Sequence, residues 1–158
     1  MKKFLTKKQL SQSFAVAMIL TTNFWYVDAA TNIQQGDGAQ ATGVNTIAIG
    51  TDAQSTEAQS IAIGKATVAS GYNTIVLGVD SSATSKDSIA IGNESHAETN
   101  PGNIAIGVNT NSTGGAAVAI GSNSTATGPS STAVGNTSTA TGNYSIAIGN
   151  GADSTGTR

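Results

Sequence analysis

The sequence has no cysteine, and only 10% of its 158 residues are charged and 4% are aromatic. The absence of cysteine excludes a disulfide framework and any metal site built on thiolate ligands. The rest of the chain is mainly Gly, Ala, Ser, Thr, Asn and Ile. A globular core of ordinary thickness needs more large side chains than this. The composition therefore predicts a thin structure with a narrow interior.

Histidine occurs once, at His96, so one chain has no histidine pair and no histidine-centred metal cluster. We interpret His96 as a solvated surface residue with, at most, a role in ligand contact. A calcium-binding roll would need the nonapeptide Gly-Gly-x-Gly-x-Asp, which the sequence lacks. We find no catalytic constellation. The prediction is a protein that is not an enzyme and that uses no metal and no cofactor.

The first thirty residues have the pattern of a secretory signal peptide. Four lysines near the start precede the apolar run 14–20, and Val27-Asp28-Ala29 matches a small-residue cleavage site. Seven apolar residues fall well short of the roughly 20 that a membrane-spanning helix needs. We predict that residues 1–29 are a signal peptide and that the protein is exported.

Basic residues are scarce in the predicted mature chain. After cleavage, three basic residues stand against eight acidic ones, a net charge of −5. Proteins that bind nucleic acid rely on Lys and Arg contacts to phosphate. Nucleic acid is therefore excluded as a partner.

A short repeat organises the remainder of the chain. The pattern Ile-Ala-Ile-Gly, with small variations, occurs eight times, and its glycine recurs at every fourteenth position except for one interval of fifteen. A fixed period of this length is typical of a stacked repeat. Numbering each copy from its glycine as position 0, these glycines are Gly50, Gly64, Gly78, Gly92, Gly107, Gly121, Gly135 and Gly149.

Two short β-strands are predicted for each coil of the repeat. Positions −3 and −1 carry Ile, Leu or Val except at Thr132, position −2 carries Ala except at Val76, and positions +3 and +5 carry small residues. Such alternation is the period-2 pattern of a strand. We predict that the aliphatic residues at −3 and −1 face the core and that Ala at −2 faces outwards.

The corners between strands are assigned to glycine. Glycine stands at position 0 in every copy and at +7 in most, and it adopts positive φ without steric cost. The result is a two-sided parallel β-solenoid. The extra residue of the long interval is expected at the Pro101-Gly102 corner, without a shift of the strands. Residues 30–43 are interpreted as a degenerate N-terminal capping coil and residues 44–158 as the repeats proper.

A column of alanines on an outward face would suit close packing against another chain. We therefore predict a homo-oligomer that packs along the position −2 alanines.

The repeats resemble the head repeats of YadA-type trimeric autotransporter adhesins. The resemblance rests on segments such as 143–152 (NYSIAIGNGA) and 122–128 (SNSTATG), and it extends from Gly36 to Arg158. It implies a left-handed parallel β-roll, a homotrimer, and display on the outer surface of a Gram-negative bacterium. Heads of this family bind host matrix proteins such as collagen, or other cells. The family's stalk and barrel anchor are absent from this sequence, so we expect a surface protein if an anchor follows and a secreted one otherwise.

Position +6 carries a column of hydroxyls that supports a rival hypothesis. Threonine ladders on flat solenoids can order water, as in some ice-binding proteins, although Thr also simply suits an exposed strand. A third alternative is a passive surface spacer. Position +4, the neighbouring outward column, carries Thr at Thr125 and Thr139. The candidate ligand-binding residues of these two columns are Thr113, Thr125, Thr127, Thr139 and Thr141.

Overall fold

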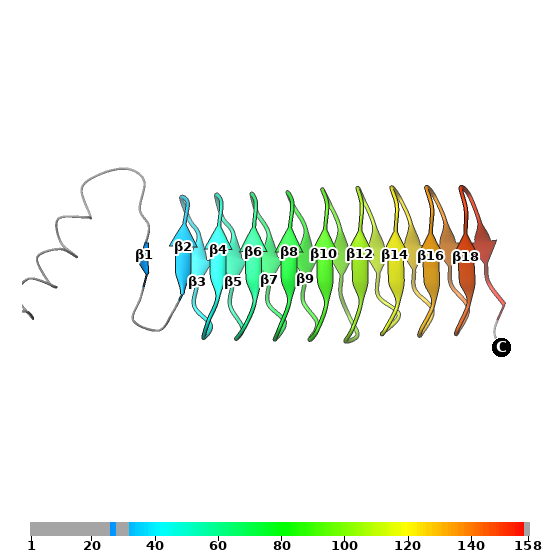
Figure 1. Cartoon of the computed structure of the whole chain (residues 1–158), viewed down its shortest axis with the longest axis horizontal. Helices are drawn as coiled ribbons and strands as arrows, with labels where there is room; N and C mark the ends of the chain where they lie inside the picture. The colour runs from blue at the N-terminus through cyan, green and yellow to red at the C-terminus, as the bar shows by residue number, and fades with distance from the viewer. Residues whose placement is uncertain (1–25, 28–31, 157–158) are drawn as a thin grey trace, which may run out of the picture.

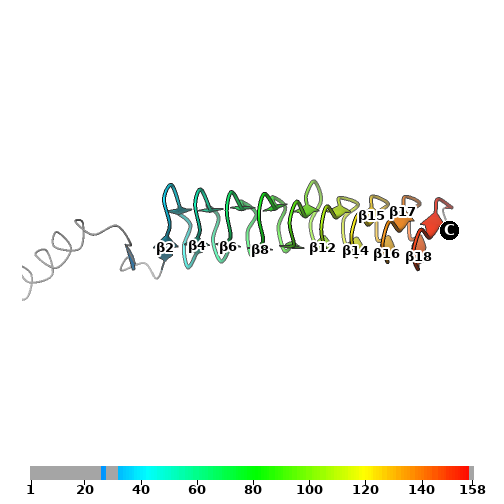
Figure 2. The same cartoon turned by 90° about the horizontal axis from the view of Figure 1, so that it is seen from above.

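The computed structural model describes residues 26–27 and 32–156, in which all regular secondary structure is β-strand. Nine coils succeed one another along a single axis, and each gives one strand to each of two sheets (Figures 1 and 2). At about 4.8 Å between neighbouring strands, the stack is about 40 Å long.

One sheet has ten strands in chain order. They are β1 (Tyr26–Val27), β2 (Ile33–Gln35), β4 (Ile47–Ile49), β6 (Ile61–Ile63), β8 (Ile75–Leu77), β10 (Ile89–Ile91), β12 (Ile104–Ile106), β14 (Val118–Ile120), β16 (Thr132–Val134) and β18 (Ile146–Ile148). Strand β1 pairs antiparallel with β2, and all the others pair in parallel.

The second sheet has nine strands, which alternate in the chain with those of the first. They are β3 (Gln40–Ala41), β5 (Gln54–Ser55), β7 (Val68–Ala69), β9 (Ser82–Ala83), β11 (His96–Ala97), β13 (Asn111–Ser112), β15 (Thr125–Ala126), β17 (Thr139–Ala140) and β19 (Asp153–Ser154).

Equivalent positions of the repeat lie directly above one another. Ile61 pairs with Ile75, for example, and Ala105 pairs with Ala119. The prediction of a parallel β-solenoid with two short strands in each coil is confirmed.

The predicted facing of the first strand is wrong. The alanines at position −2 are buried inside the coil, and those from Ala48 to Ala133 have no exposed surface. The aliphatic residues at −3 and −1 point outwards and are half-buried or exposed. The small residues at +3 and +5 do face inwards, as predicted.

The inversion has a steric cause. A coil this short places its two strands back to back, and both contribute only small side chains to the space between them. Val76 is the largest fully buried side chain, and the rest of the apolar interior is alanine. Interiors pack at crystal-like density, so an isoleucine at every coil would force the two sheets apart. The interior is narrow because it holds alanine, and the isoleucines are left on the outside.

The corners also differ from the prediction. Glycines at position 0 have positive φ, as at Gly64 (φ +131), but those at +7 do not. Glycine at +7 serves close approach instead, because a Cβ at Gly71 would meet the carbonyl group of Ser85 in the next coil. Non-glycine residues at +2 and +9, such as Asp52 and Asn73, also have positive φ.

The extra residue of the long interval lies where it was expected. His96 pairs with Ser82 one coil before it and with Asn111 one coil after it, and only the second step contains the extra residue, so the insertion follows β11. Both sheets stay in register, since Ile89 still pairs with Ile104.

A buried asparagine holds this longer corner. The Asn103 side chain is fully buried. Its Nδ2 donates to the carbonyls of Glu98 and Asn100, each at 2.7 Å. Its Oδ1 accepts from the N–H groups of Gly115 at 2.9 Å and Ala117 at 3.2 Å. One side chain therefore satisfies four backbone groups, two at its own corner and two in the next coil.

Replacing Asn103 with alanine should lower the free energy of unfolding by about 2–4 kcal/mol, because buried backbone groups lose their partners. Ser131 is the control, since it occupies the same repeat position and its buried Oγ has no hydrogen-bond partner. Ser131→Ala should leave the stability unchanged or raise it slightly. Urea denaturation of both variants measures the difference, and equal midpoints would refute the role given to Asn103.

The predicted signal peptide falls largely outside the described residues, and its boundary stays a prediction, as do the limits of the capping coil. Within the described part, Tyr26 pairs with Gln34 and Val27 with Ile33, next to the first coil. No helix among the described residues is long and apolar enough to cross a membrane.

Candidate functional site

An aliphatic stripe runs along the outer face of the β2–β18 sheet. It consists of the residues at positions −3 and −1 of the repeats, which are Ile47, Ile49, Ile61, Ile63, Ile75, Leu77, Ile89, Ile91, Ile104, Ile106, Val118, Ile120, Val134, Ile146 and Ile148. Neighbouring coils cover part of each side chain, but Ile120, Ile146 and Ile148 remain 36%, 64% and 69% exposed. A contiguous apolar surface of this length is characteristic of an interaction surface.

The opposite sheet presents a polar outer face. Its outward columns are positions +4 and +6, which hold all five threonines predicted from the sequence. Thr113, Thr125 and Thr139 are half-buried, and Thr127 and Thr141 are exposed. We call these five and Asn111 the threonine face. Its rows are in register, because Asn111 pairs with Thr125 and Thr125 pairs with Thr139.

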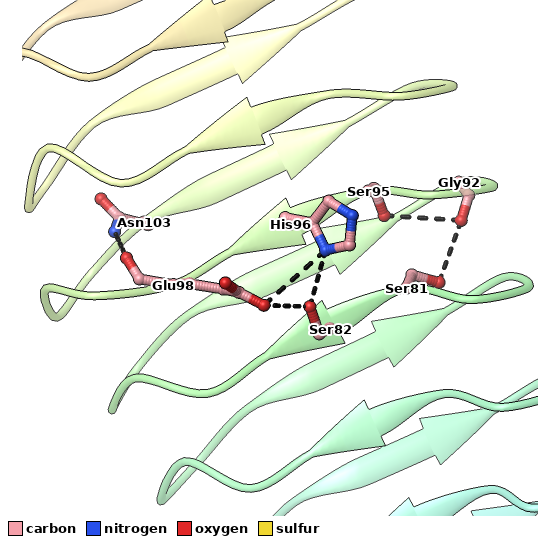
Figure 3. Close-up of polar contacts among 7 residues, drawn as sticks. All are labelled: Ser81, Ser82, Gly92, Ser95, His96, Glu98 and Asn103. Carbon is pink, nitrogen blue, oxygen red and sulfur yellow. Dashed lines mark hydrogen bonds and ion pairs between the residues drawn. The ribbon is translucent and has the colours of Figure 1, made fainter.

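One compact side-chain cluster lies on the same outer face, nearer the N-terminal end (Figure 3). The Ser82 hydroxyl lies 2.7 Å from His96 Nδ1 and donates a hydrogen bond to the Glu98 carboxylate. His96 Nδ1 and Glu98 Oε1 are 3.7 Å apart. His96 is half-buried and faces outwards, as predicted.

This cluster does not have the geometry of a nucleophilic triad. In a triad, the hydroxyl and the carboxylate bind opposite nitrogens of the imidazole, so that the acid orients the base. Here Ser82 and Glu98 both approach Nδ1. The described residues also contain no group of three or more histidine and acidic side chains that could hold a metal ion. The cluster is best described as cross-strand polar contacts on a solvated sheet.

Charge is distributed unevenly along the axis of the solenoid. This feature was not predicted from the sequence, because the repeat pattern compares equivalent positions of the repeats and not successive coils. Residues 32–98 carry seven acidic side chains and two lysines, a net charge of −5. The stretch that follows, 99–152, contains no charged residue and no histidine. Because a solenoid converts sequence position into axial position, the coils divide into an acidic half and an uncharged half, and Asp153 in β19 closes the uncharged half next to Thr139.

The corner at positions +8 and +9 carries two exposed tyrosines. Tyr72 already has a neighbour, because Lys86 Nζ lies 5.9 Å from its ring centroid. Beside this pair, Asn73 Nδ2 donates a hydrogen bond to Asp87 Oδ1 at 2.8 Å. Tyr144 lies on the uncharged half and is 63% exposed. Its φ of +56 is unusual for a bulky residue.

A stack of short coils with an outward aliphatic stripe and a polar opposite face defines a parallel β-solenoid repeat protein with two surfaces available for contact. A family profile described as "YadA head domain repeat (2 copies)" matches residues 41–67, 69–95, 104–124 and 126–152, which is more than half of the chain. The chain belongs to this YadA head-repeat family.

A solved structure has the same fold. It is the collagen-binding domain of the Yersinia adhesin YadA, with 23% sequence identity and a TM-score of 0.51, and the match covers 75% of this chain and 67% of that one. No curated protein sequence matches the chain. Family and fold together support an adhesin-like role, and they favour it over ice binding.

Proposed function

We propose that the protein is the head of a trimeric adhesin that is exported to the bacterial surface and attaches to host matrix or to other cells. The observation that carries the proposal is the aliphatic stripe. Packing three stripes around a common axis would remove fifteen aliphatic side chains per chain from water. Each Å² of apolar surface so buried contributes about 25 cal/mol.

The corrected facing changes which column would pack subunits. The alanines at −2 lie inside the coil and are unavailable to a partner. The aliphatic residues at −3 and −1 take over that role in the proposal. The number three comes from membership of the family and not from the stripe, which would serve a dimer equally well.

The polar face would remain outside such a trimer, because it lies on the sheet opposite the stripe. We assign ligand contact to the threonine face. The solved structure with the same fold is a collagen-binding domain, which makes collagen the first ligand to test. Attachment through many weak contacts suits a repetitive surface, since avidity multiplies them.

Sedimentation equilibrium of the purified chain should give three times the mass of one chain. Solid-phase assays against collagen, fibronectin and laminin should show saturable binding to at least one of them. A stable monomer would overturn the assembly. A stable trimer that binds no matrix protein and no cells would favour the alternative function, a passive surface spacer.

A further inference from the structure

We infer that the threonine face and Tyr144 together recognise an uncharged polysaccharide. This rests on the proposed adhesin function and specifies the class of its ligand. Three features of the uncharged half support it: unused hydroxyls in a regular array, the absence of ionic groups from residues 99–152, and an exposed aromatic ring.

The first feature is the array of hydroxyls. The rows of the threonine face repeat at the strand spacing of about 4.8 Å, and the two columns are two residues apart, about 6.6 Å. Within the part of the chain that the structure describes, none of the five threonine hydroxyls has a hydrogen-bond partner. Most inward hydroxyls are hydrogen-bonded, as when Ser112 Oγ donates to the carbonyl of Ala117 at 2.9 Å, and Ser131 and Ser145 are exceptions.

Each free hydroxyl can both donate and accept a hydrogen bond. A flat, rigid array of such groups is complementary to a polymer whose own hydroxyls recur at regular intervals. Rigidity lowers the entropy that binding costs. A polysaccharide chain has this repeated hydroxyl chemistry.

The second feature is the absence of charge. Nothing in residues 99–152 can form an ion pair with a sulfate, carboxylate or ammonium group. Acidic residues bound the face at both ends, since Glu98 precedes Thr113 in the +6 column and Asp153 pairs with Thr139 in the +4 column. They would repel an anionic polymer and would attract a cationic one to the ends of the face. The partner best matched to the uncharged half is therefore neutral.

The third feature is Tyr144, at the corner that joins Thr141 of the threonine face to Ile146 of the aliphatic stripe. Other coils place Asn45, Gln59, Asn73, Asp87, Ala116 or Ser130 at this corner, all with positive φ and none of them aromatic. Positive φ is unusual for a residue with a large side chain. The Tyr144 ring is 63% exposed and is therefore open to contact with a partner. An aromatic face can stack on the apolar C–H face of a sugar ring.

A peptide cannot bind to this face by strand addition. Extended peptides bind by adding a strand to a sheet edge. Here the backbone of the face is already paired between coils, as in the bonds from Thr125 N–H to the Ser138 carbonyl and from Thr139 N–H to the Ala152 carbonyl, both 2.8 Å. Only side chains are available for contact.

The test measures binding of the purified chain to immobilised dextran, galactomannan, heparin and alginate at low and high salt. We expect binding to at least one of the two neutral polysaccharides, with little dependence on salt, and none to the two anionic ones. The variant T125V/T127V/T139V/T141V keeps strand-forming side chains but removes four hydroxyls, and it should weaken binding about tenfold or more. Y144N should weaken binding while leaving the melting temperature unchanged or higher, because Asn tolerates positive φ better than Tyr.

The matched control is T42V/T56V/T84V, which alters the same +6 column in the acidic half and should bind normally. Unchanged binding by both the Thr-to-Val and the Y144N variants would overturn the inference. So would preference for heparin or alginate, or thermal hysteresis without polysaccharide binding. Trimer mass and matrix binding are measured on the same samples. A trimer that binds matrix proteins but no neutral polysaccharide defeats this inference alone, whereas a monomer that binds nothing defeats the proposed function as well.

Discussion

Replacing Ala90 with aspartate should prevent the solenoid from folding or lower its free energy of unfolding by more than about 4 kcal/mol. Ala90 has no exposed surface and lies between two sheets lined with small side chains. A carboxylate there would be buried without a partner and would also be too large for the space. Circular dichroism should show a weakened β-strand signal and an early thermal transition.

The adjacent residue is the control. Ile91 points out of the same strand into the aliphatic stripe. Ile91→Asp should leave a folded chain that sediments as a monomer, since the charge faces water until subunits associate. If the aliphatic residues at −3 and −1 formed the core, as predicted from the sequence, Ile91→Asp would instead unfold the protein. If Ile91→Asp abolishes the β-strand signal while Ala90→Asp melts like the parent protein, the facing described above is incorrect.

Gly64→Ala is expected to destabilise the solenoid by about 3 kcal/mol or more, because backbone strain and a steric clash act together. Gly64 has a φ of +131, a region essentially restricted to glycine, and an added Cβ would overlap the carbonyl oxygen of Gly78 in the next coil. Chemical denaturation would quantify the loss.

Gly149→Ala separates these two causes. Gly149 has nearly the same φ, +125, but the nearest atom to an added Cβ is Ala152 Cβ at 4.0 Å. This variant should lose only the contribution of backbone strain and be clearly milder than Gly64→Ala. Equal losses would mean that the close approach of coils at position 0 contributes little to stability.

The threonine face shows how far the site could be predicted. Period-2 alternation identifies residues that share a face, and the period of the repeat aligns them between coils, so the outward Thr columns followed from the sequence. Their role in binding stays a prediction. The cluster of Ser82, His96 and Glu98 was not predicted, because its members come from neighbouring coils and from two columns in which no other coil repeats this combination.

The period of the coil, the parallel in-register pairing and the place of the insertion all follow from the amino-acid sequence. They depend on local repetition, since identical segments pair best when like residues align. Only the folded coil showed which face of each strand lies inside. Alternation in the sequence defines two faces of a strand but does not say which of them is buried. The distance between the two sheets decides which face is buried. That distance depends on the small residues at positions −4, −2, +3 and +5 together. The same holds for Asn103, whose four backbone partners come together only when neighbouring coils stack.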